Sequence, residues 1–315
     1  MLGLTAAAQP AAAQGFPERP LRIVVPFSPG GATDVGARLL AEALTAVSPQ
    51  PVVVENRVGG AGLVGAETVA RAAPDGHTLL FNNTSQAVLR VVVPNAAFDP
   101  HQALAPLTIL TEMPMVMLVA NSFPAQDGRE FISLVRANPG KYDYGSTGGG
   151  GTLGMAALLF LTTTGLEMNE IPYRGGAPAT LDLSAGRIAL VFDIALTGLQ
   201  TARGGQARAF AVTGPRRSPA APEVPTWREI GVEAEMQVWQ ALFVPSATPA
   251  PVREALHAMV ARVQEGEALR RRWAELGVDR VMALPPAESE RYFAGELERW
   301  ERLMRNYRAP QGAPR

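Results

Sequence analysis

The chain has 315 residues, of which 47 % are hydrophobic, and this is enough for one large domain or two moderate ones with a sizeable core. Its formal net charge of −1 argues against nucleic acid or an anionic membrane as the main partner, because both select a basic surface. The chain has no cysteine, which excludes disulfides, thiolate chemistry and cysteine-ligated metals. No stretch approaches the ~20 apolar residues of a membrane-spanning helix.

The first 15 residues are unusual because they are small, apolar and uncharged. Ala11, Ala12 and Ala13 before Gln14 have the small-x-small character of a signal-peptidase site, although a basic segment and a long Leu-rich segment are missing. We expect residues 1–15 to be a signal-peptide remnant or a disordered tail, favour the remnant, and exclude them from the fold.

The next feature is an apolar, β-branched strand at 21–25 that runs through a Pro/Gly turn into a helical pattern at 34–47. Thr33 and Asp34 are good N-cap residues, and two preceding glycines let the backbone approach a bound group closely. A helix N-terminus presents free N–H groups and a positive dipole end, which suits an anion. The same device also occurs in α/β proteins without a ligand, so this segment alone leaves binding open.

Strands and helices alternate along the rest of the chain. The patterns predict strands over 21–25, 51–54, 77–81, 107–110, 116–119, 142–146, 188–193, 207–212 and 238–244. They predict helices over 34–47, 65–73, 128–137 and 152–163, one between 193 and 207, and two or three that close the chain. This alternation implies an α/β architecture with mainly parallel sheets.

The strand–glycine–helix device occurs a second time, at 144–152, where four consecutive glycines follow a predicted strand. Ligands of open α/β sheets bind at the carboxyl ends of strands. Two such loops in two halves of the chain could therefore face each other across a cleft and present N–H donors to one anionic ligand.

Other motifs are weaker. Gly60, Gly62 and Gly65 fit G-x-G-x-x-G, but the next strand ends in Asn82 rather than in the acidic residue that a dinucleotide site needs. The three histidines have no partner at helical spacing, and no base is placed near the hydroxyls of the glycine loops. We therefore expect no metal, no cofactor and no catalytic residues.

Several segments are together specific for one family. They are 17–34, 53–57 with the glycine loop to 65, 73–80, 137–141, 144–146 and 171–175. They resemble the Bug family, the periplasmic solute receptors of tripartite tricarboxylate transporters, and the resemblance extends from Phe16 to about Met304.

The resemblance implies an α/β chain with the two-lobed, type II periplasmic-binding-protein fold, in which each lobe is a mainly parallel sheet flanked by helices. The ligand cleft lies between the lobes. We expect residues 16–118 and 243–315 to form lobe one and residues 119–242 to form lobe two, because the C-terminal helices need a sheet to cover.

The resemblance also implies a function. It describes a monomeric periplasmic receptor, not an enzyme, that captures a small organic carboxylate by hinge closure and delivers it to membrane permease subunits. The ligand-binding residues that it implies are Phe27, Ser28, Gly30, Gly31, Ala32, Thr33, Asp34, Asn83, Thr84, Ser85, Ser146, Gly149, Gly150, Thr152, Tyr173, Arg174 and Asp193. Two alternatives remain at this stage: an α/β enzyme of acyl or phosphoryl transfer with the glycine loops as an anion hole, and a sensing receptor not coupled to transport.

Overall fold

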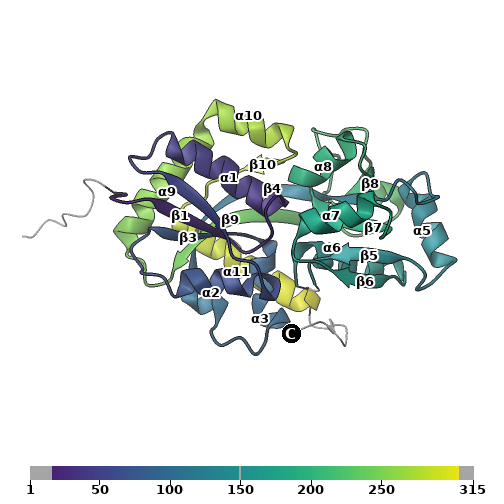
Figure 1. Ribbon diagram of the computed structural model, residues 1–315, viewed down its shortest axis with the longest axis horizontal. Coiled ribbons are helices and arrows are strands. Elements are labelled where there is room, and N and C mark those ends of the chain that lie inside the picture. Colours follow the sequence, from purple (N-terminus) through teal and green to yellow (C-terminus); the bar gives the residue numbers. More distant parts are fainter. Residues whose placement is uncertain (1–15, 149, 305–315) are drawn as a thin grey trace, which may run out of the picture.

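The computed structural model describes residues 16–148 and 150–304, which form an elongated molecule with two lobes (Figure 1). The expectations for residues 1–15, Gly149 and 305–315 lie outside the described residues. In Figure 1 the purple N-terminal segments and the yellow C-terminal helix share one lobe, whereas the teal and green middle of the chain builds the other.

Strands and helices alternate as expected. The strands are β1 (Leu21–Val25), β2 (Val52–Asn56), β3 (Thr78–Asn83), β4 (Leu104–Val119), β5 (Asp143–Ser146), β6 (Asn169–Pro172), β7 (Leu190–Ile194), β8 (Arg208–Val212), β9 (Gln237–Pro245) and β10 (Arg280–Val281). The α-helices are α1 (Ala32–Thr45), α2 (Leu63–Ala70), α3 (Leu89–Val92), α4 (Pro100–Ala103), α5 (Gly128–Arg136), α6 (Thr152–Thr164), α7 (Gly176–Ser184), α8 (Ala195–Arg203), α9 (Ala250–Glu265), α10 (Glu267–Glu275) and α11 (Pro286–Met304). Short 3₁₀ helices are η1 (Gly60–Gly62), η2 (Thr84–Val88) and η3 (Arg228–Ile230).

The strands follow the order β2-β1-β3-β9-β4-β7-β5-β6, and β8 and β10 also pair with β4. The expected parallel pairing is present among the outer strands, where β1 pairs with β2 and β3, and β5 pairs with β6 and β7. The central strands β4 and β9 pair antiparallel with their neighbours. The sheet is therefore mixed, with parallel units at both ends of the molecule.

Strand β4 crosses from one lobe to the other. Its residues 104–114 pair with β9, and its residues 115–119 pair with β7. The chain returns between the end of β8 at Val212 and the start of β9 at Gln237. We call residues 16–114 and 237–304 the first lobe and residues 115–236 the second lobe. These crossings lie a few residues before the boundaries at 118 and 242 expected from the sequence.

The C-terminal helix α11 packs on the strands of the first lobe. Ser289 accepts a hydrogen bond of 3.1 Å from the backbone N–H of Ile109 in β4. The indole N–H groups of Trp239 in β9 and Trp300 in α11 both donate to Glu296, at 2.9 and 3.0 Å. Because both indoles are almost fully buried, their N–H groups require such a partner. The first and last parts of the chain thus share one core.

The structure corrects three local expectations. The stretches 107–110 and 116–119 belong to one continuous strand, because Pro114 stands where β4 changes partners and its missing N–H costs little there. Helix α1 begins earlier than expected, with Gly31 as its N-cap, so Thr33 and Asp34 lie in the first turn rather than capping it. Helix α7 lies in a segment for which the sequence patterns predicted no helix.

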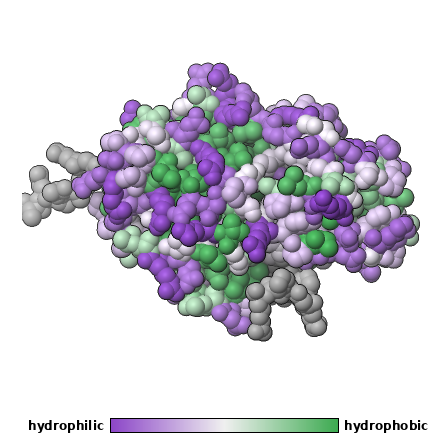
Figure 2. Space-filling model, viewed as in Figure 1, coloured by the Kyte–Doolittle hydropathy of each residue, from purple (hydrophilic) through white to green (hydrophobic). Residues whose placement is uncertain are grey.

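The surface is mostly hydrophilic. Figure 2 shows hydrophilic residues around separate hydrophobic patches on this face of the molecule, rather than a continuous apolar band. Within residues 16–148 and 150–304, no helix is both long enough and apolar enough to cross a membrane.

Candidate functional site

Hydrogen bonds to Asp34 fix the conformation of the loop before α1. One carboxylate oxygen of Asp34 accepts hydrogen bonds from the N–H of Gly30 at 2.9 Å and from Arg38 at 3.0 Å, and the other accepts one from Asn56 at 2.9 Å. Burial opposes ionisation, but these bonds from Arg38, Gly30 and Asn56 outweigh it and lower the pKa of Asp34. Gly30 has a φ of +79°, a conformation that favours glycine. Asp34 thus shapes the loop, and no side chain caps α1 at Gly31.

The loop before α6 has a similar construction in the second lobe. The hydroxyl of Ser146 donates a 2.5 Å hydrogen bond to Glu170, which holds the end of β5. Gly150 has no room for a side chain, since a Cβ atom there would lie 2.1 Å from Val92 of the first lobe. Helix α6 then begins at the N-cap Gly151, again without a side-chain cap. The loop before α6 thus packs against α3 of the first lobe.

A third helix N-terminus, that of α7, faces the first. Its N-cap is Gly175, and it too has no side-chain cap. A Cβ atom on Gly31 would lie 3.7 Å from the amide nitrogen of Gly176 and 3.8 Å from that of Ala177. The first-turn N–H groups of a helix have no partner within the helix. Three uncapped N-termini with their positive dipole ends therefore gather between the lobes.

Asn83 joins the two lobes beside these helices. Its side-chain nitrogen donates to Thr33 of α1 at 2.8 Å, and its oxygen accepts from Thr152 of α6 at 2.7 Å and from the N–H of Ser85 at 2.9 Å. The neighbouring Thr84 accepts a 3.1 Å hydrogen bond from the backbone of β9. All five residues are buried. The polar side chains at the end of β3 thus connect α1 to α6 through hydrogen bonds.

Asp193 lies at the end of β7 and is 2 % exposed. Its two oxygens accept hydrogen bonds from the N–H of Ile194 at 2.9 Å and from Thr197 at 2.7 Å, at the start of α8. Burial raises its pKa to about 6, although these two hydrogen bonds act in the opposite direction. A Cβ atom on Gly176 would lie 3.0 Å from one carboxylate oxygen. Asp193 therefore supports α8 and also faces the first turn of α7.

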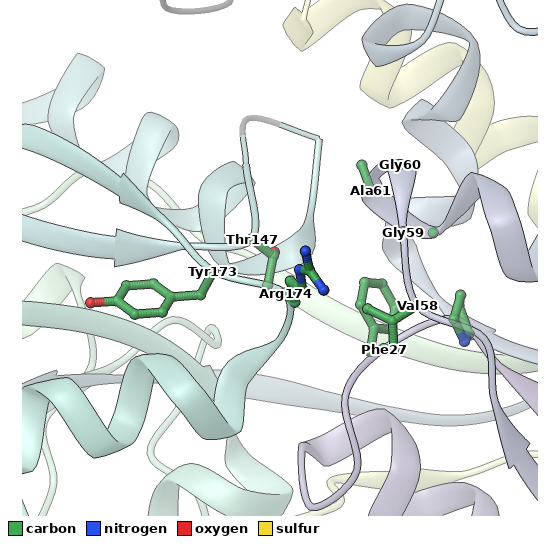
Figure 3. Close-up of a pocket in the computed structure, with 10 residues that line it drawn as sticks. Phe27, Val58, Gly59, Gly60, Ala61, Thr147, Tyr173 and Arg174 are labelled. Atoms are coloured by element: carbon green, nitrogen blue, oxygen red, sulfur yellow. The ribbon is translucent and has the colours of Figure 1, made fainter. Parts of the chain in front are cut away.

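A cavity of about 110 Å³ lies between the loops that lead into α1, α6 and α7 (Figure 3). It is lined by Pro26, Phe27, Val58, Gly59, Gly60, Ala61, Gly62, Thr147, Tyr173 and Arg174. The ring of Tyr173 is directed away from Phe27 and Arg174 (Figure 3), and its hydroxyl donates to Asp182 at 2.7 Å. The backbone carbonyl of Arg174 accepts a 3.0 Å hydrogen bond from Ser28 across the lobes.

The structure thus places most of the residues expected from the sequence around one interlobe space. Gly30, Gly31, Ser146, Gly150 and Asn83 lie on the converging loops or join them. The sequence reasoning missed α7 and the cavity wall formed by residues 58–62, whereas Thr147 lies within the predicted glycine loop at 144–152. A signal for α7 was available, since Pro178 follows two glycines closely and proline is tolerated in a first helical turn.

The histidines have structural contacts. His101 approaches the carbonyl of Gln86 at 2.8 Å, and His257 approaches that of Ala283 at 3.1 Å. Burial lowers the pKa of His101. In the part of the chain that the structure describes, no three histidine, aspartate or glutamate side chains gather closely enough to hold a metal ion.

Two α/β lobes, joined by two crossing segments and separated by a polar interlobe site, define the class of periplasmic solute-binding proteins. The sequence confirms this class. Residues 36–308 match the tripartite tricarboxylate transporter family receptor, and the chain belongs to this family of solute-binding receptors, which are not enzymes.

Individual proteins show the same similarity. BugT of Bordetella pertussis is 32 % identical over 301 residues, which cover 95 % of this chain and 92 % of BugT. The structure of MatC from Rhodopseudomonas palustris with bound malate is 32 % identical, with a TM-score of 0.85 over 91 % of this chain and 99 % of MatC. R. palustris Rpa4515 with adipate is 30 % identical, with a TM-score of 0.88 over 92 % of this chain and 97 % of that protein. The expected family and fold are therefore confirmed.

Proposed function

We propose that this chain is a periplasmic receptor that binds a small organic carboxylate between its lobes and delivers it to the permease subunits of a tripartite transporter. One observation carries the proposal: three uncapped helix N-termini, those of α1, α6 and α7, gather in the interlobe space. Free N–H groups and aligned dipoles at such positions stabilise a carboxylate.

The distribution of charge supports a ligand of low charge. The first turns of α1, α6 and α7 contain no basic side chain, so a bound carboxylate would be neutralised by N–H dipoles and water. Such a site suits one or two carboxylates better than a densely charged ligand such as citrate. The malate of MatC and the adipate of Rpa4515 are small carboxylates of this kind.

Hinge closure is the motion that we infer for capture. The first and second lobes are connected at β4 and between β8 and β9, and the interlobe contacts of Asn83 and Ser28 would separate when the lobes open. We infer that the receptor acts as a monomer, as the family resemblance implies. Family membership supports the periplasmic location and the permease partner.

A thermal-shift screen of carboxylates tests this proposal, with the primary amide of each acid as its matched control. A true ligand at 100 times its Kd should add about 2.7 kcal/mol to the free energy of unfolding. We expect at least one small carboxylate to raise the melting temperature while its amide does not. The proposal fails if no carboxylate stabilises the protein or if the amides stabilise it equally.

A further inference from the structure

The glycine-rich loop at 58–62 lies directly across the cavity from Arg174 of the second lobe (Figure 3). We propose that Arg174, Thr147 and this loop form a second anion subsite, which binds the distal acidic group of a ligand with two carboxylates. The inference rests on the proposed function, because it assumes that the first carboxylate lies at the N-termini of α1, α6 and α7.

The charge of the cavity favours an anion. Arg174 is the one charged residue among the ten that line it. Its side chain is exposed, and among the described residues the guanidinium has no ion pair or hydrogen bond. Figure 3 shows the guanidinium extending toward Phe27 and Val58, on the side opposite to the ring of Tyr173. A planar guanidinium binds a carboxylate through two parallel hydrogen bonds.

Thr147 supplies a second polar group. It is 9 % exposed, and its hydroxyl has no hydrogen-bond partner within the described parts of the chain. The hydroxyl lies over Gly151, where a Cβ atom would come within 1.8 Å of it, so it reaches a ligand in the cavity only after a change of rotamer. Because a buried hydroxyl without a partner costs free energy, a ligand that accepts its hydrogen bond would favour that change. Thr147 lies next to Arg174 in the close-up view (Figure 3).

The opposite wall is backbone. Gly59, Gly60, Ala61 and Gly62 all have positive φ, and none has a side chain larger than a methyl group. The left-handed conformation of Ala61 is uncommon for a residue other than glycine and often marks a functional segment. This wall lets a ligand approach the main chain closely. It gives the Gly60–Gly62 motif a role unrelated to nucleotides.

The size of the cavity limits its occupant. Its volume of about 110 Å³ is well below the roughly 300–1,000 Å³ of pockets that hold a whole drug-sized molecule. A dinucleotide is therefore excluded, whereas one acidic group and its last methylene fit.

The cavity also adjoins the first carboxylate site. Phe27, Thr147 and Arg174 stand on the loops that lead into α1, α6 and α7 respectively. The hydrogen bond from Ser28 to the carbonyl of Arg174 brings the two lobes together at this place. The subsite is therefore complete only when the lobes are closed, so the distal acidic group would favour the closed form.

Calorimetry with pairs of ligands tests the subsite. Each C4 to C6 dicarboxylate is compared with its monoamide, which has the same length but one charge less, in a zwitterionic buffer. We expect the wild type to prefer the dicarboxylate by roughly 10- to 100-fold, the effect of a charge-assisted bidentate contact. Arg174→Met should abolish this preference without changing the affinity for the monoamide.

Two further variants complete the experiment. Thr147→Val should reduce the preference by about tenfold or less, as expected for one hydroxyl contact. Arg271→Met, which removes an exposed charge on α10, should retain it fully. The subsite is refuted if the wild type binds acid and monoamide equally, or if Arg174→Met weakens both alike. If the wild type binds neither ligand of any pair, the proposed carboxylate function itself fails.

Discussion

The hydroxyl of Thr152 in the second lobe donates a 2.7 Å hydrogen bond to the side-chain oxygen of Asn83 in the first lobe. The side-chain nitrogen of Asn83 in turn donates to Thr33 at the start of α1. Asn83 thereby connects the N-termini of α1 and α6. Because these helices also form the proposed carboxylate site, the proposal makes both lobe closure and ligand binding depend on this contact.

Thr152→Val tests this connection. The variant removes the interlobe hydrogen bond, while the oxygen of Asn83 keeps its bond from the N–H of Ser85. One net hydrogen bond corresponds to about a two- to tenfold change in an equilibrium constant. We expect a larger radius of gyration by small-angle X-ray scattering and a weaker affinity by about this factor. Thr162→Val, on the exposed side of α6, is the control, and unchanged scattering and affinity in Thr152→Val would refute the connection.

Gly31→Val tests the position of the carboxylate. Gly31 has a φ of −79°, so valine is compatible with the backbone, and its Cβ would be in ordinary contact with α7. The two methyl groups would extend into the space between α1 and α7. We expect loss of ligand binding in calorimetry with nearly unchanged thermal stability. Normal binding by the variant would show that the carboxylate lies elsewhere.

Thr213→Val tests the crossing between the lobes. The buried hydroxyl of Thr213 accepts a 2.8 Å hydrogen bond from the N–H of Met115 and donates one of 2.6 Å to the carbonyl of Met236. Valine would leave both backbone groups unpaired, which should cost about 1–3 kcal/mol of unfolding free energy. Chemical denaturation measures this, with Thr68→Val on the surface of α2 as control. A loss no larger than that of the control would contradict the role of Thr213.

Asp193→Asn tests the buried carboxyl through pH. Burial raises its pKa to about 6 in the folded protein, compared with about 3.9 in the unfolded chain. The folded state therefore binds the proton more tightly, and this contribution to stability is complete below about pH 4 and lost as the pH rises through about 6. Relative to the wild type, the variant should gain stability over this interval by up to about 3 kcal/mol.

Denaturation of both proteins at several pH values provides the measurement, and a constant difference between them would refute the raised pKa. Calorimetry at one neutral pH then separates two roles of Asp193. A changed preference among hydroxylated and unsubstituted acids would indicate ligand contact through the first turn of α7. Unchanged preference would restrict Asp193 to its hydrogen bonds with Ile194 and Thr197.

Local sequence patterns predicted the parts of the site that lie on strand–loop–helix units. The loops before α1 and α6 were found because glycines follow a predicted strand and precede a helical pattern in both places, and these signals span only a few residues. The role of Asp34 was harder to predict from the sequence. Arg38 is four residues further along the same helix, but Asn56 lies at the end of β2 and the N–H of Gly30 in the loop, so only the fold shows that the carboxylate shapes the loop.

Contacts between distant segments could not be predicted in this way. Gly31 and Gly176 are far apart in sequence, yet they face each other because β4 joins the two lobes. The continuity of β4 through Pro114 was also missed, because proline usually interrupts a strand and only its place at the change of partners makes it tolerable.

The central claim is that a carboxylate binds at the meeting of α1, α6 and α7. A crystal structure of the protein with the carboxylate found in the thermal-shift screen tests it most directly. The account predicts closed lobes and a carboxylate whose oxygens accept hydrogen bonds from first-turn N–H groups of these helices, near Gly31 and Gly176. A ligand bound outside the interlobe space, or one whose carboxylate makes no contact with these N–H groups, would contradict it.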